Sequence, residues 1–467
     1  TCRAFKDPAL DVLWAQLHSL DALVLCSGGK RDENDQSIWD RPLYDADWRV
    51  LAQYGKRVRT LTISPQSNTR DISTMQLLSC FPVPGPILPN LTRLNWLSDR
   101  EEFFPFLRRF CGPDLRALSL EPISWSIHKC AAIASLAPSC PLLQEFTCVN
   151  AEDSSMQSIS EAVLGWNRLQ VLQVGPLDEQ ALTHAGSLQT LQDLRFSILN
   201  LRSPMLEFCS PRAALKISTP SLSSFYVFIE NIHFSTQRLH LFCERYTGVF
   251  PKLFFSRLKA CFRNPAELLE LGLVKTIPHN RSIVLSSVML DSLLSFKGLN
   301  YLNLADLCTS HIDDAFLEEM AVSCPNLHDL YLGDKGCWVV APQATFGGVI
   351  SLLKHCHQLS SLGIFFSATI ESNFVLQADA INLNVNKFSV GASHISDPMT
   401  VTVVLSWLIP NAIRINHCKQ VVGEFRAIGK GWETVNTWFK PFVSARKHSW
   451  EQGWSEGKSV VEQNAIA

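Results

Sequence analysis

The chain has 467 residues, of which 46% are hydrophobic and 18% charged, and its 41 basic and 43 acidic side chains give a net charge of −2. This composition is typical of a folded protein too long for one ordinary core, so it predicts either several domains or an array of repeats. The balanced charge offers no basic face for nucleic acid or anionic lipid. The longest apolar run, Val401 to Ile409, is too short to span a bilayer. We therefore expect neither nucleic acid nor a membrane as partner.

The N-terminal segment predicts one amphipathic helix. Asp7 followed by Pro8 is typical of a helix start, because Asp caps the first turn and proline fits within it. The apolar residues Leu10, Leu13, Trp14 and Leu17 then follow at helical spacing and form one stripe. Residues 26–56 are interpreted as a linker followed by a capping helix, from Trp39 to Tyr54, that covers the first repeat.

A repeated apolar pattern, L-x-x-L-x-L, occupies residues 57–400, where L stands for any large apolar residue. The middle residues of successive units recur about every 30 residues. A period of this length is typical of leucine-rich repeats that contain a helix, and the sequence predicts about twelve of them. The units are Val58-Leu61-Ile63, Leu91-Leu94-Trp96, Leu115-Leu118-Leu120, Leu143-Phe146-Cys148, Leu169-Leu172-Val174, Leu191-Leu194-Phe196, Leu222-Phe225-Val227, Leu268-Leu271-Leu273, Leu299-Leu302-Leu304, Leu327-Leu330-Leu332, Leu359-Leu362-Ile364 and Val385-Phe388-Val390.

Each unit predicts a short strand and a returning helix. The last two apolar positions alternate along a strand, so both side chains point to the same side. Leu317, Met320, Ala321 and Cys324 lie at helical spacing between two such strands, with Asp313 or Asp314 as the cap. The predicted fold is an α/β solenoid: an arc of the ribonuclease-inhibitor type, with parallel strands on the concave face and helices on the convex face.

Two parts of the chain depart from the regular pattern. The step of 46 residues between Phe225 and Leu271 leaves residues 228–265 irregular, either as a hidden degenerate repeat or as an insertion. Residues 401–467 are interpreted as a degenerate last repeat followed by a C-terminal cap, because a solenoid must close its exposed last coil. Apolar residues that suit the cap are Trp432, Val435, Trp438, Phe439 and Phe442.

Two stretches resemble known families. Cys140, Cys324 and Cys356 each precede the first strand position by three residues, and the stretch Cys308 to Leu327 resembles the cysteine-containing subclass of leucine-rich repeats. The string Cys2-Arg3-Ala4-Phe5, with Leu10, Leu13 and Trp14, resembles the end of an F-box as found in fungal F-box proteins with leucine-rich repeats. The resemblance implies that residues 1–25 are the C-terminal remnant of an F-box whose earlier part is missing from the chain.

Patterns that would indicate catalysis are missing from the sequence. There is no glycine-rich phosphate loop, no H-E-x-x-H and no G-x-S-x-G. His355-Cys356-His357 is the densest group of metal-ligand types, but its residues cannot all face one ion and Cys356 has a core position. We expect no catalytic residue, cofactor or metal. The 15 cysteines, without any C-x-x-C, predict reduced thiols and hence a cytoplasmic or nuclear protein.

The remaining candidate for function is the concave surface, where the outward strand residues could contact an extended partner. Tyrosine and arginine are enriched at interaction hot spots. The predicted protein-binding residues are Arg93, Arg195, Tyr226, Asn300, Tyr301, Asn303, His328, Asp329 and Tyr331. The preferred patch is the group between 300 and 331.

These observations favour a non-catalytic protein-recognition solenoid. The F-box resemblance implies a substrate receptor of an SCF-type ubiquitin ligase, with an adaptor subunit contacting Phe5, Leu10, Leu13 and Trp14, a cullin behind that adaptor, and an unknown target protein on the concave face. The alternative is a leucine-rich-repeat scaffold or small-GTPase regulator without ligase function.

Overall fold

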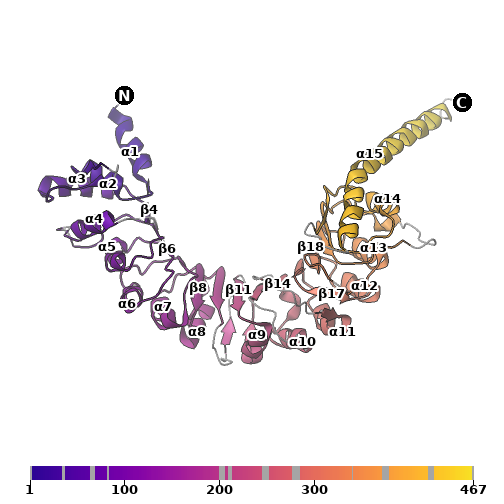
Figure 1. Ribbon diagram of the computed structural model, residues 1–467, viewed down its shortest axis with the longest axis horizontal. Helices are drawn as coiled ribbons and strands as arrows, with labels where there is room; N and C mark the ends of the chain where they lie inside the picture. Colours follow the sequence, from indigo (N-terminus) through magenta and orange to yellow (C-terminus); the bar gives the residue numbers. More distant parts are fainter. Residues whose placement is uncertain are drawn as a thin grey trace. The chain divides into compact units, whose positions relative to one another are not determined.

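The computed structural model describes residues 3–33, 37–63, 69–80, 82, 84–198, 206–208, 213–243, 252–275, 284–338, 340–370, 378–418 and 425–464. The chain divides into two compact units. Unit 1 comprises Thr1–Ser218 and Asn231–Thr236, and unit 2 comprises Thr219–Glu230 and Gln237–Ala467. In each unit most of the helices lie along one side of the strands (Figure 1).

Unit 1 is built on a parallel sheet whose strands follow one another in chain order. Each strand pairs with the next in a register that aligns the middle apolar residue of the repeat, so that Leu61, Leu94 and Leu118 are direct neighbours. These leucines are at most 2% exposed. The strands are β1 (Gln16–Leu17), β4 (Thr60–Ile63), β5 (Arg93–Trp96), β6 (Ala117–Leu120), β7 (Glu145–Cys148), β8 (Val171–Pro176), β9 (Asp193–Ser197) and β11 (Ala214–Thr219).

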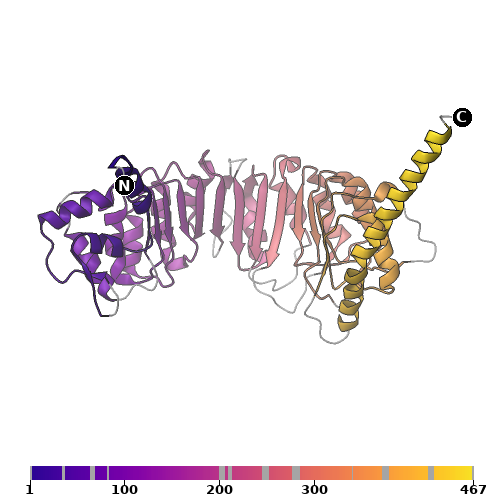
Figure 2. The same cartoon turned by 90° about the horizontal axis from the view of Figure 1, so that it is seen from above.

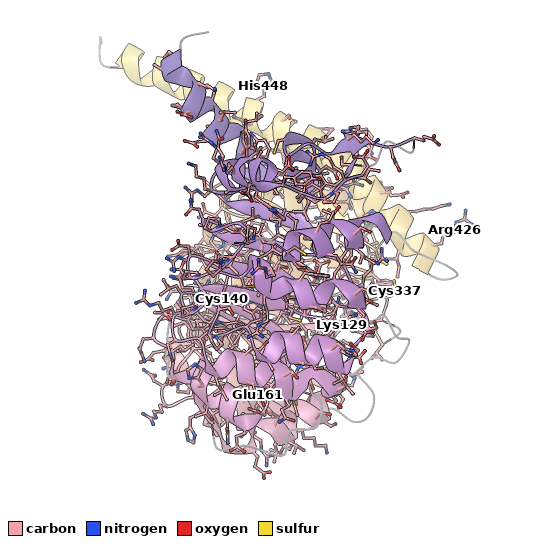
Figure 3. The ribbon with its side chains drawn as sticks, turned by 90° about the vertical axis from the view of Figure 1, so that its left-hand side faces the viewer. Lys129, Cys140, Glu161, Cys337, Arg426 and His448 are labelled. Atoms are coloured by element: carbon pink, nitrogen blue, oxygen red, sulfur yellow. The ribbon has the colours of Figure 1, made fainter. Side chains whose placement is uncertain are left out.

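Helices of unit 1 bury the apolar side of this sheet. Two of them begin where a side chain caps the first turn: at α6 Ser126 accepts from the Lys129 amide, and at α8 Asp178 accepts from the Ala181 amide. The helices are α1 (Lys6–Trp14), α2 (Asp21–Cys26), α3 (Asp45–Gly55), α4 (Thr69–Ser79), α5 (Leu107–Phe110), α6 (Ile127–Ala134), α7 (Met156–Leu164) and α8 (Glu179–Ser187). Lys129 of α6 and Cys140, which follows it, are labelled among the side chains in Figure 3.

Unit 2 repeats the same plan. Its parallel strands are β13 (Arg238–Cys243), β14 (Glu270–Lys275), β16 (Tyr301–Leu304), β18 (Asp329–Leu332), β19 (Ser361–Ile364), β20 (Lys387–Gly391) and β21 (Ile415–His417). Its helices are α9 (Leu222–Phe228), α10 (Phe254–Ala260), α11 (Ser287–Leu290), α12 (Asp314–Ser323), α13 (Phe346–His355), α14 (Pro398–Leu408) and α15 (Phe425–Asn464). The long helix α15 stands out in Figure 2. The fold of both units is therefore an α/β leucine-rich-repeat solenoid.

Minor strand pairs lie outside the main sheets. Two of them are parallel, β10 (Leu206–Phe208) with β12 (Ile232–Phe234) and β15 (Val284–Ser286) with β17 (Cys308–His311). The third, β2 (Lys30–Arg31) with β3 (Ser37–Ile38), is an antiparallel pair within the predicted linker. Among the described helices, none has the length and apolar character needed to cross a bilayer.

The predicted helix between Leu304 and Leu327 is confirmed as α12. Asp313 is its cap and accepts a hydrogen bond from the Phe316 amide at 3.0 Å. Asp314 instead reaches the next repeat, where its carboxylate accepts from the Thr345 amide at 2.7 Å. One aspartate thus starts the helix while its neighbour ties two repeats together.

The cysteines that mark the repeats are core residues. Cys140, Cys324 and Cys356 are at most 2% exposed, and the Cys324 thiol donates to the Phe296 carbonyl of the preceding repeat at 3.5 Å. Burial raises the pKa of Cys324 to about 11 and that of Cys356 to about 12. The thiols of Cys324 and Cys356 are therefore protonated and unreactive at neutral pH.

The unit predicted at Leu222-Phe225-Val227 is wrong. These residues belong to helix α9, and Val227 is 52% exposed. The strands that this region adds to the main sheet are β11 and β13, whose buried pairs are Leu215 with Ile217 and Leu239 with Leu241. The long step therefore hides a degenerate repeat. In place of its first apolar residue stands the buried Thr236, whose hydroxyl donates to the Ala213 carbonyl.

The predicted N-terminal helix also needs correction. Helix α1 ends at Trp14, and Leu17 lies in strand β1, which pairs with β4. Asp7 makes no capping bond but forms an ion pair with Arg57 at 2.7 Å. The helix predicted from Trp39 begins only at Asp45. The sheet thus begins before residue 57 and, through β21, continues beyond residue 400.

Candidate protein-binding surface

The candidate surface of unit 2 is the sheet face opposite the helices. Because side chains alternate along a strand, residues between the buried apolar positions lie on this face. The cross-strand register places them in two rows. One row is His240, Gly272, Asn303, Tyr331, Gly363 and Ser389; the other is Arg238, Glu270, Tyr301, Asp329, Ser361 and Lys387.

Three aromatic rings meet on this face, and we call His240, Tyr301 and Tyr331 the aromatic patch. The Tyr301 ring lies 5.7 Å from that of His240 and 6.3 Å from that of Tyr331, between centroids. Glycines make room for the outer rings. A Cβ atom at Gly272 would stand 2.6 Å from His240 Nδ1, and one at Gly363 would stand 2.7 Å from Tyr331 Cδ1. Both distances are too short, so any larger residue would displace the rings.

Carboxylates flank the central tyrosine. Glu270 and Asp329 are its direct cross-strand neighbours on either side. Partial burial and the charges of Asp329 and Glu270 raise the pKa of Tyr301, against a lowering by the Asn303 hydrogen bond. The hydroxyl therefore stays protonated at neutral pH. A ring face beside two carboxylates suits a cationic or hydrogen-bonding side chain of a partner.

Most residues predicted between 300 and 331 lie together on this face, but they differ in accessibility. His328 is exposed, and its Nδ1 lies 2.8 Å from Asp329 Oδ2, while Asn300, Tyr301, Asp329 and Tyr331 are half-buried. Asn303 is only 7% exposed. Its amide donates to the Tyr301 hydroxyl at 3.0 Å and accepts from the Ala305 amide at 3.1 Å. Asn303 is thus largely buried and bonded to the Tyr301 hydroxyl.

Asp334 lies at the edge of this patch and was not among the predicted residues. Asp334 is 6% exposed, and its Oδ1 has no hydrogen-bond partner in the described part of the chain. Burial raises the pKa of this carboxyl, although a hydrogen bond from Ser389 opposes the shift. Asp334 lies close to Tyr331 and to Gly363 and Ser389 of the next two strands. Because those two strands are distant in the sequence, no local motif indicates this position.

The predicted residues Arg93 and Arg195 lie in unit 1, on strands β5 and β9. Arg93 is exposed and pairs with Glu145, two strands away, at 2.8 Å. Arg195 is half-buried and lies beside Lys216 of strand β11. Lys216 Nζ lies 2.5 Å from Asp193 Oδ2, an ion pair that was missed because β11 itself was not predicted.

Tyr226 is not on the sheet face, contrary to its prediction. It belongs to helix α9, and the Arg257 guanidinium lies over its ring at 4.0 Å from the centroid. Arg257 also donates to the Tyr226 carbonyl at 3.3 Å. The prediction for Tyr226 was wrong because it assumed that residues 222–227 form a strand, whereas they form helix α9.

Helix α1 carries a second candidate surface, in unit 1. Arg57 pairs with both Asp7 and Asp11, and the Trp14 ring packs 4.5 Å from that of Tyr54. These contacts attach one side of α1 to the first repeat. On the other side Phe5 and Leu13 are each 72% exposed and Val12 is 79% exposed. Of the predicted adaptor-binding residues, Phe5 and Leu13 are thus exposed, Leu10 is half-buried, and Trp14 is buried.

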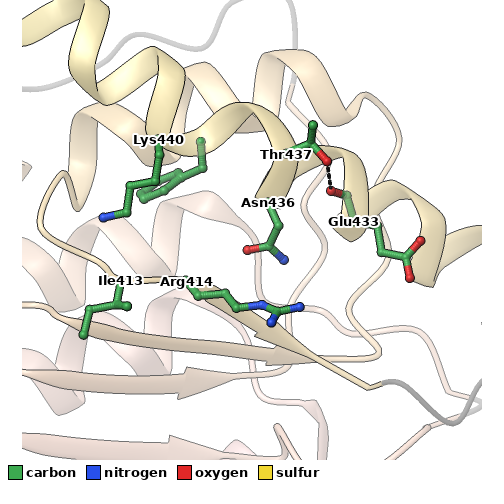
Figure 4. A pocket seen from close by; sticks show the side chains of 7 residues that line it. Ile413, Arg414, Glu433, Asn436, Thr437 and Lys440 are labelled. Carbon is green, nitrogen blue, oxygen red and sulfur yellow. Dashed lines mark hydrogen bonds between the residues drawn. The ribbon is translucent and has the colours of Figure 1, made fainter.

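A pocket of about 430 Å³ lies where α15 meets the last strand of unit 2 (Figure 4). Its lining residues are Ile413, Arg414, Glu433, Asn436, Thr437, Phe439 and Lys440. The polar groups here serve the fold: Asn436 bonds to the backbone of Ile415, and Lys440 Nζ donates to the Ala412 carbonyl at 2.7 Å. Within the described ranges, no three His, Cys, Asp or Glu side chains are placed to hold a metal ion.

Comparison with known proteins gives distant likenesses only. No protein-family model and no curated protein matches the chain. A chain from the crystal structure of the Rad7 and Elc1 complex in yeast is 13% identical over 90% of this chain and 92% of that chain, with a TM-score of 0.38. An internalin from Listeria monocytogenes is 11% identical over 88% of this chain and 95% of that chain, with a TM-score of 0.37. At these values neither likeness bears on what the chain binds.

Proposed function

We propose that the protein is a non-catalytic recognition solenoid that binds a target protein on the exposed sheet face of unit 2. The observation that carries the proposal is the aromatic patch. Two half-buried tyrosines lie side by side over glycine-lined strands, with carboxylates at their flanks. Rigid, partly desolvated tyrosines are the residues that dominate binding energy at protein interfaces.

Replacing Tyr301 and Tyr331 together by alanine should weaken target binding at least tenfold, since hot-spot residues contribute roughly 2 kcal/mol or more each. The target is first isolated with the wild-type protein, and its Kd is then measured for both proteins. Tyr226→Ala is the matched control, because it removes a tyrosine of unit 2 from the helix side. Equal affinity of the double variant and the wild type would refute this surface, provided that both melt at the same temperature.

We further propose that the protein is a substrate receptor of an SCF-type ubiquitin ligase, acting in the cytoplasm or nucleus. The F-box resemblance of residues 2 to 14 suggests this role, and the exposed apolar side of α1 supports it. In this proposal Phe5, Val12 and Leu13 contact the adaptor subunit or the preceding F-box helices, and the cullin binds through the adaptor. Ubiquitin transfer is then promoted by proximity, and this chain supplies no reacting group.

The ligase role is tested by co-expressing the adaptor with the chain extended by its natural upstream sequence. The extended wild-type chain should co-purify with the adaptor, and Phe5→Ser with Leu13→Ser should abolish the complex. Ile123→Ser is the control, because Ile123 is an exposed apolar residue of unit 1 outside α1. If the extended chain does not bind the adaptor while target binding persists, the alternative role as a scaffold or small-GTPase regulator replaces the ligase role.

A further inference from the structure

Two cysteines that lie 81 residues apart in the sequence are neighbours in unit 2. Cys337 lies in the segment that follows strand β18, and Cys418 follows strand β21 directly. Their Sγ atoms are 2.8 Å apart. A disulfide bond measures about 2.05 Å, so less than about 1 Å separates this arrangement from a covalent link. Cys337 is exposed and Cys418 is half-buried, so small molecules can reach the pair.

The backbone holds both cysteine-bearing segments against the same residue, Gly391. On one side the Cys418 amide donates to the Gly391 carbonyl at 2.8 Å. On the other side Gly391 packs against the backbone of Asp334, three residues before Cys337. Gly391 has a φ of 55°, and a Cβ atom there would stand 2.6 Å from the Asp334 carbonyl oxygen. The proximity of the two thiols therefore results from the fold of the last repeats.

The segment around Cys337 is fixed by further hydrogen bonds. The Lys335 amide donates to the Ala305 carbonyl at 3.2 Å, and the Trp338 indole donates to the Gly333 carbonyl at 2.5 Å. These bonds lie on both sides of Cys337 in the sequence. The segment is thus attached to the preceding repeat at one end and folded back on itself at the other, which orients Cys337 towards Cys418.

We propose that Cys337 and Cys418 form a reversible modification site that a low-molecular-weight disulfide of the glutathione class oxidises to an intramolecular disulfide. One protein thiolate attacks a sulfur of the small disulfide, forming a mixed disulfide and releasing one glutathione thiolate. The second protein thiolate then attacks the protein sulfur of the mixed disulfide and releases the second glutathione thiolate. The protein loses two electrons, the small disulfide gains them, and the two protons pass to the released thiolates.

Among the described cysteines, this pair combines two neighbouring thiols with access to solvent, whereas the neighbours Cys111 and Cys140 are both buried. Cys111, Cys140, Cys148, Cys243, Cys261, Cys308, Cys324 and Cys356 are buried. Cys80 is exposed, but its thiol donates to the Gln76 carbonyl. Partial burial and the adjacent Cys418 thiol raise the pKa of Cys337 to about 12. The thiolate is therefore scarce at neutral pH, so we expect slow exchange that follows the redox buffer over hours.

The consequence of oxidation is a covalent tie across the last repeats. The bond joins the segment after β18 to the end of β21 and thereby encloses α13, β19, β20, α14 and β21. The link removes conformational freedom from the unfolded chain. Oxidised protein should therefore melt roughly 5–15 °C above reduced protein.

Peptide mapping tests the proposal on the whole protein. After equilibration with glutathione buffers of increasing oxidised fraction, free thiols are blocked and the protein is digested with trypsin. Cleavage after Lys335, Lys354, Arg414 and Lys419 places each cysteine alone in its own peptide, residues 336–354 and 415–419. We expect these two peptides to be linked in most of the oxidised protein and released by a reductant. In Cys418→Ser, Cys337 should instead carry glutathione.

Two results would overturn the proposal. One is wild-type protein in which Cys337 carries glutathione while Cys418 is free under the same oxidising conditions. The other is an oxidised melting temperature that exceeds the reduced one equally in wild type and in Cys337→Ser. Cys80→Ser is the matched control, because it removes an exposed cysteine and should leave both the linked peptides and the melting shift intact.

Discussion

Replacing Asp99 by alanine is expected to destabilise unit 1 by about 3–5 kcal/mol, because it leaves the ammonium of Lys129 buried without its charged partner. Lys129 is 1% exposed, and its Nζ lies 2.7 Å from Asp99 Oδ1. It also donates to the Ser124 carbonyl at 2.8 Å, and the Phe104 ring lies 5.2 Å away. A lone charge in such surroundings is costly, and the protein would have to deprotonate it or unfold locally.

The same aspartate organises the loop before α6. Its carboxylate accepts from the Ile123 amide at 2.7 Å, from the Ser124 amide at 3.2 Å and from the Ser124 hydroxyl at 3.0 Å. Removing the carboxylate therefore leaves these backbone donors without their acceptor, and the ammonium keeps only its bonds to Ser124, which adds to the loss.

A comparison of variants separates the unpaired charge from simple loss of contacts. Lys129→Met keeps the volume and removes the charge, while Asp99 retains its bonds to Ile123 and Ser124. We expect it to cost about 2 kcal/mol or less, because well-packed apolar residues often replace buried ion pairs. In the double variant Asp99→Ala with Lys129→Met, the loss should be smaller than for Asp99→Ala alone. Denaturant unfolding measures all three. A double variant no more stable than Asp99→Ala would show that the buried charge is not the cause.

Acid should weaken the ion pair between Asp99 and Lys129. Burial on its own raises the pKa of Asp99, but hydrogen bonds from Lys129, Ser124 and Ile123 outweigh it and hold the pKa below its ordinary value of 3.8. A carboxyl whose folded pKa is depressed contributes stability above its unfolded pKa and loses it as the pH falls through the folded pKa. The gap in stability between wild type and Asp99→Asn should therefore narrow below pH 4.

The strands could be predicted from the sequence wherever all three apolar residues of a repeat enter the core, because the apolar pattern is then complete. The prediction failed at Leu222-Phe225-Val227 because apolar residues three apart in the sequence can also lie on one face of a helix, and these residues form helix α9. It missed β13 because a buried hydroxyl, that of Thr236, satisfies a neighbouring carbonyl at a position where the pattern requires an apolar residue.

The candidate site could be predicted only in part, for a related reason. Register within a repeat places Tyr301 and Tyr331 on the sheet face, since each strand position is fixed by the leucines beside it. The contributions of Gly272, Gly363 and Asp334 depend on side chains from neighbouring strands, so nothing local indicates them. Cys337 and Cys418 likewise come together only when several repeats stack, so no motif in the sequence indicates that they are neighbours.

The second large effect is expected at the C-terminal edge of unit 2, where Asn436 of α15 takes the place of a further strand. Its Oδ1 accepts from the Ile415 amide at 3.0 Å, and its Nδ2 donates to the Ile415 carbonyl at 2.8 Å. One side chain thus pairs both backbone groups that the last strand, β21, presents at this position. In Figure 4 the Asn436 amide points from the helix towards the segment that carries Ile413 and Arg414.

Asn436→Leu keeps the volume but leaves both groups of Ile415 without partners, so we expect a loss of about 2–4 kcal/mol. The Ile415 amide should exchange with solvent much faster. Hydrogen exchange and denaturant unfolding measure these effects.

Thr437→Ala is the matched control for the cap. The Thr437 hydroxyl is exposed and donates only within the helix, to the Glu433 carbonyl at 2.9 Å, so its removal should change neither measurement. Trp432 of α15 is fully buried and donates to the Ser393 carbonyl at 2.8 Å. This contact keeps α15 attached in both variants. Because the helix remains, loss of edge protection in Asn436→Leu can be assigned to the amide itself. Unchanged exchange at Ile415 would mean that packing by Trp432 alone closes the sheet.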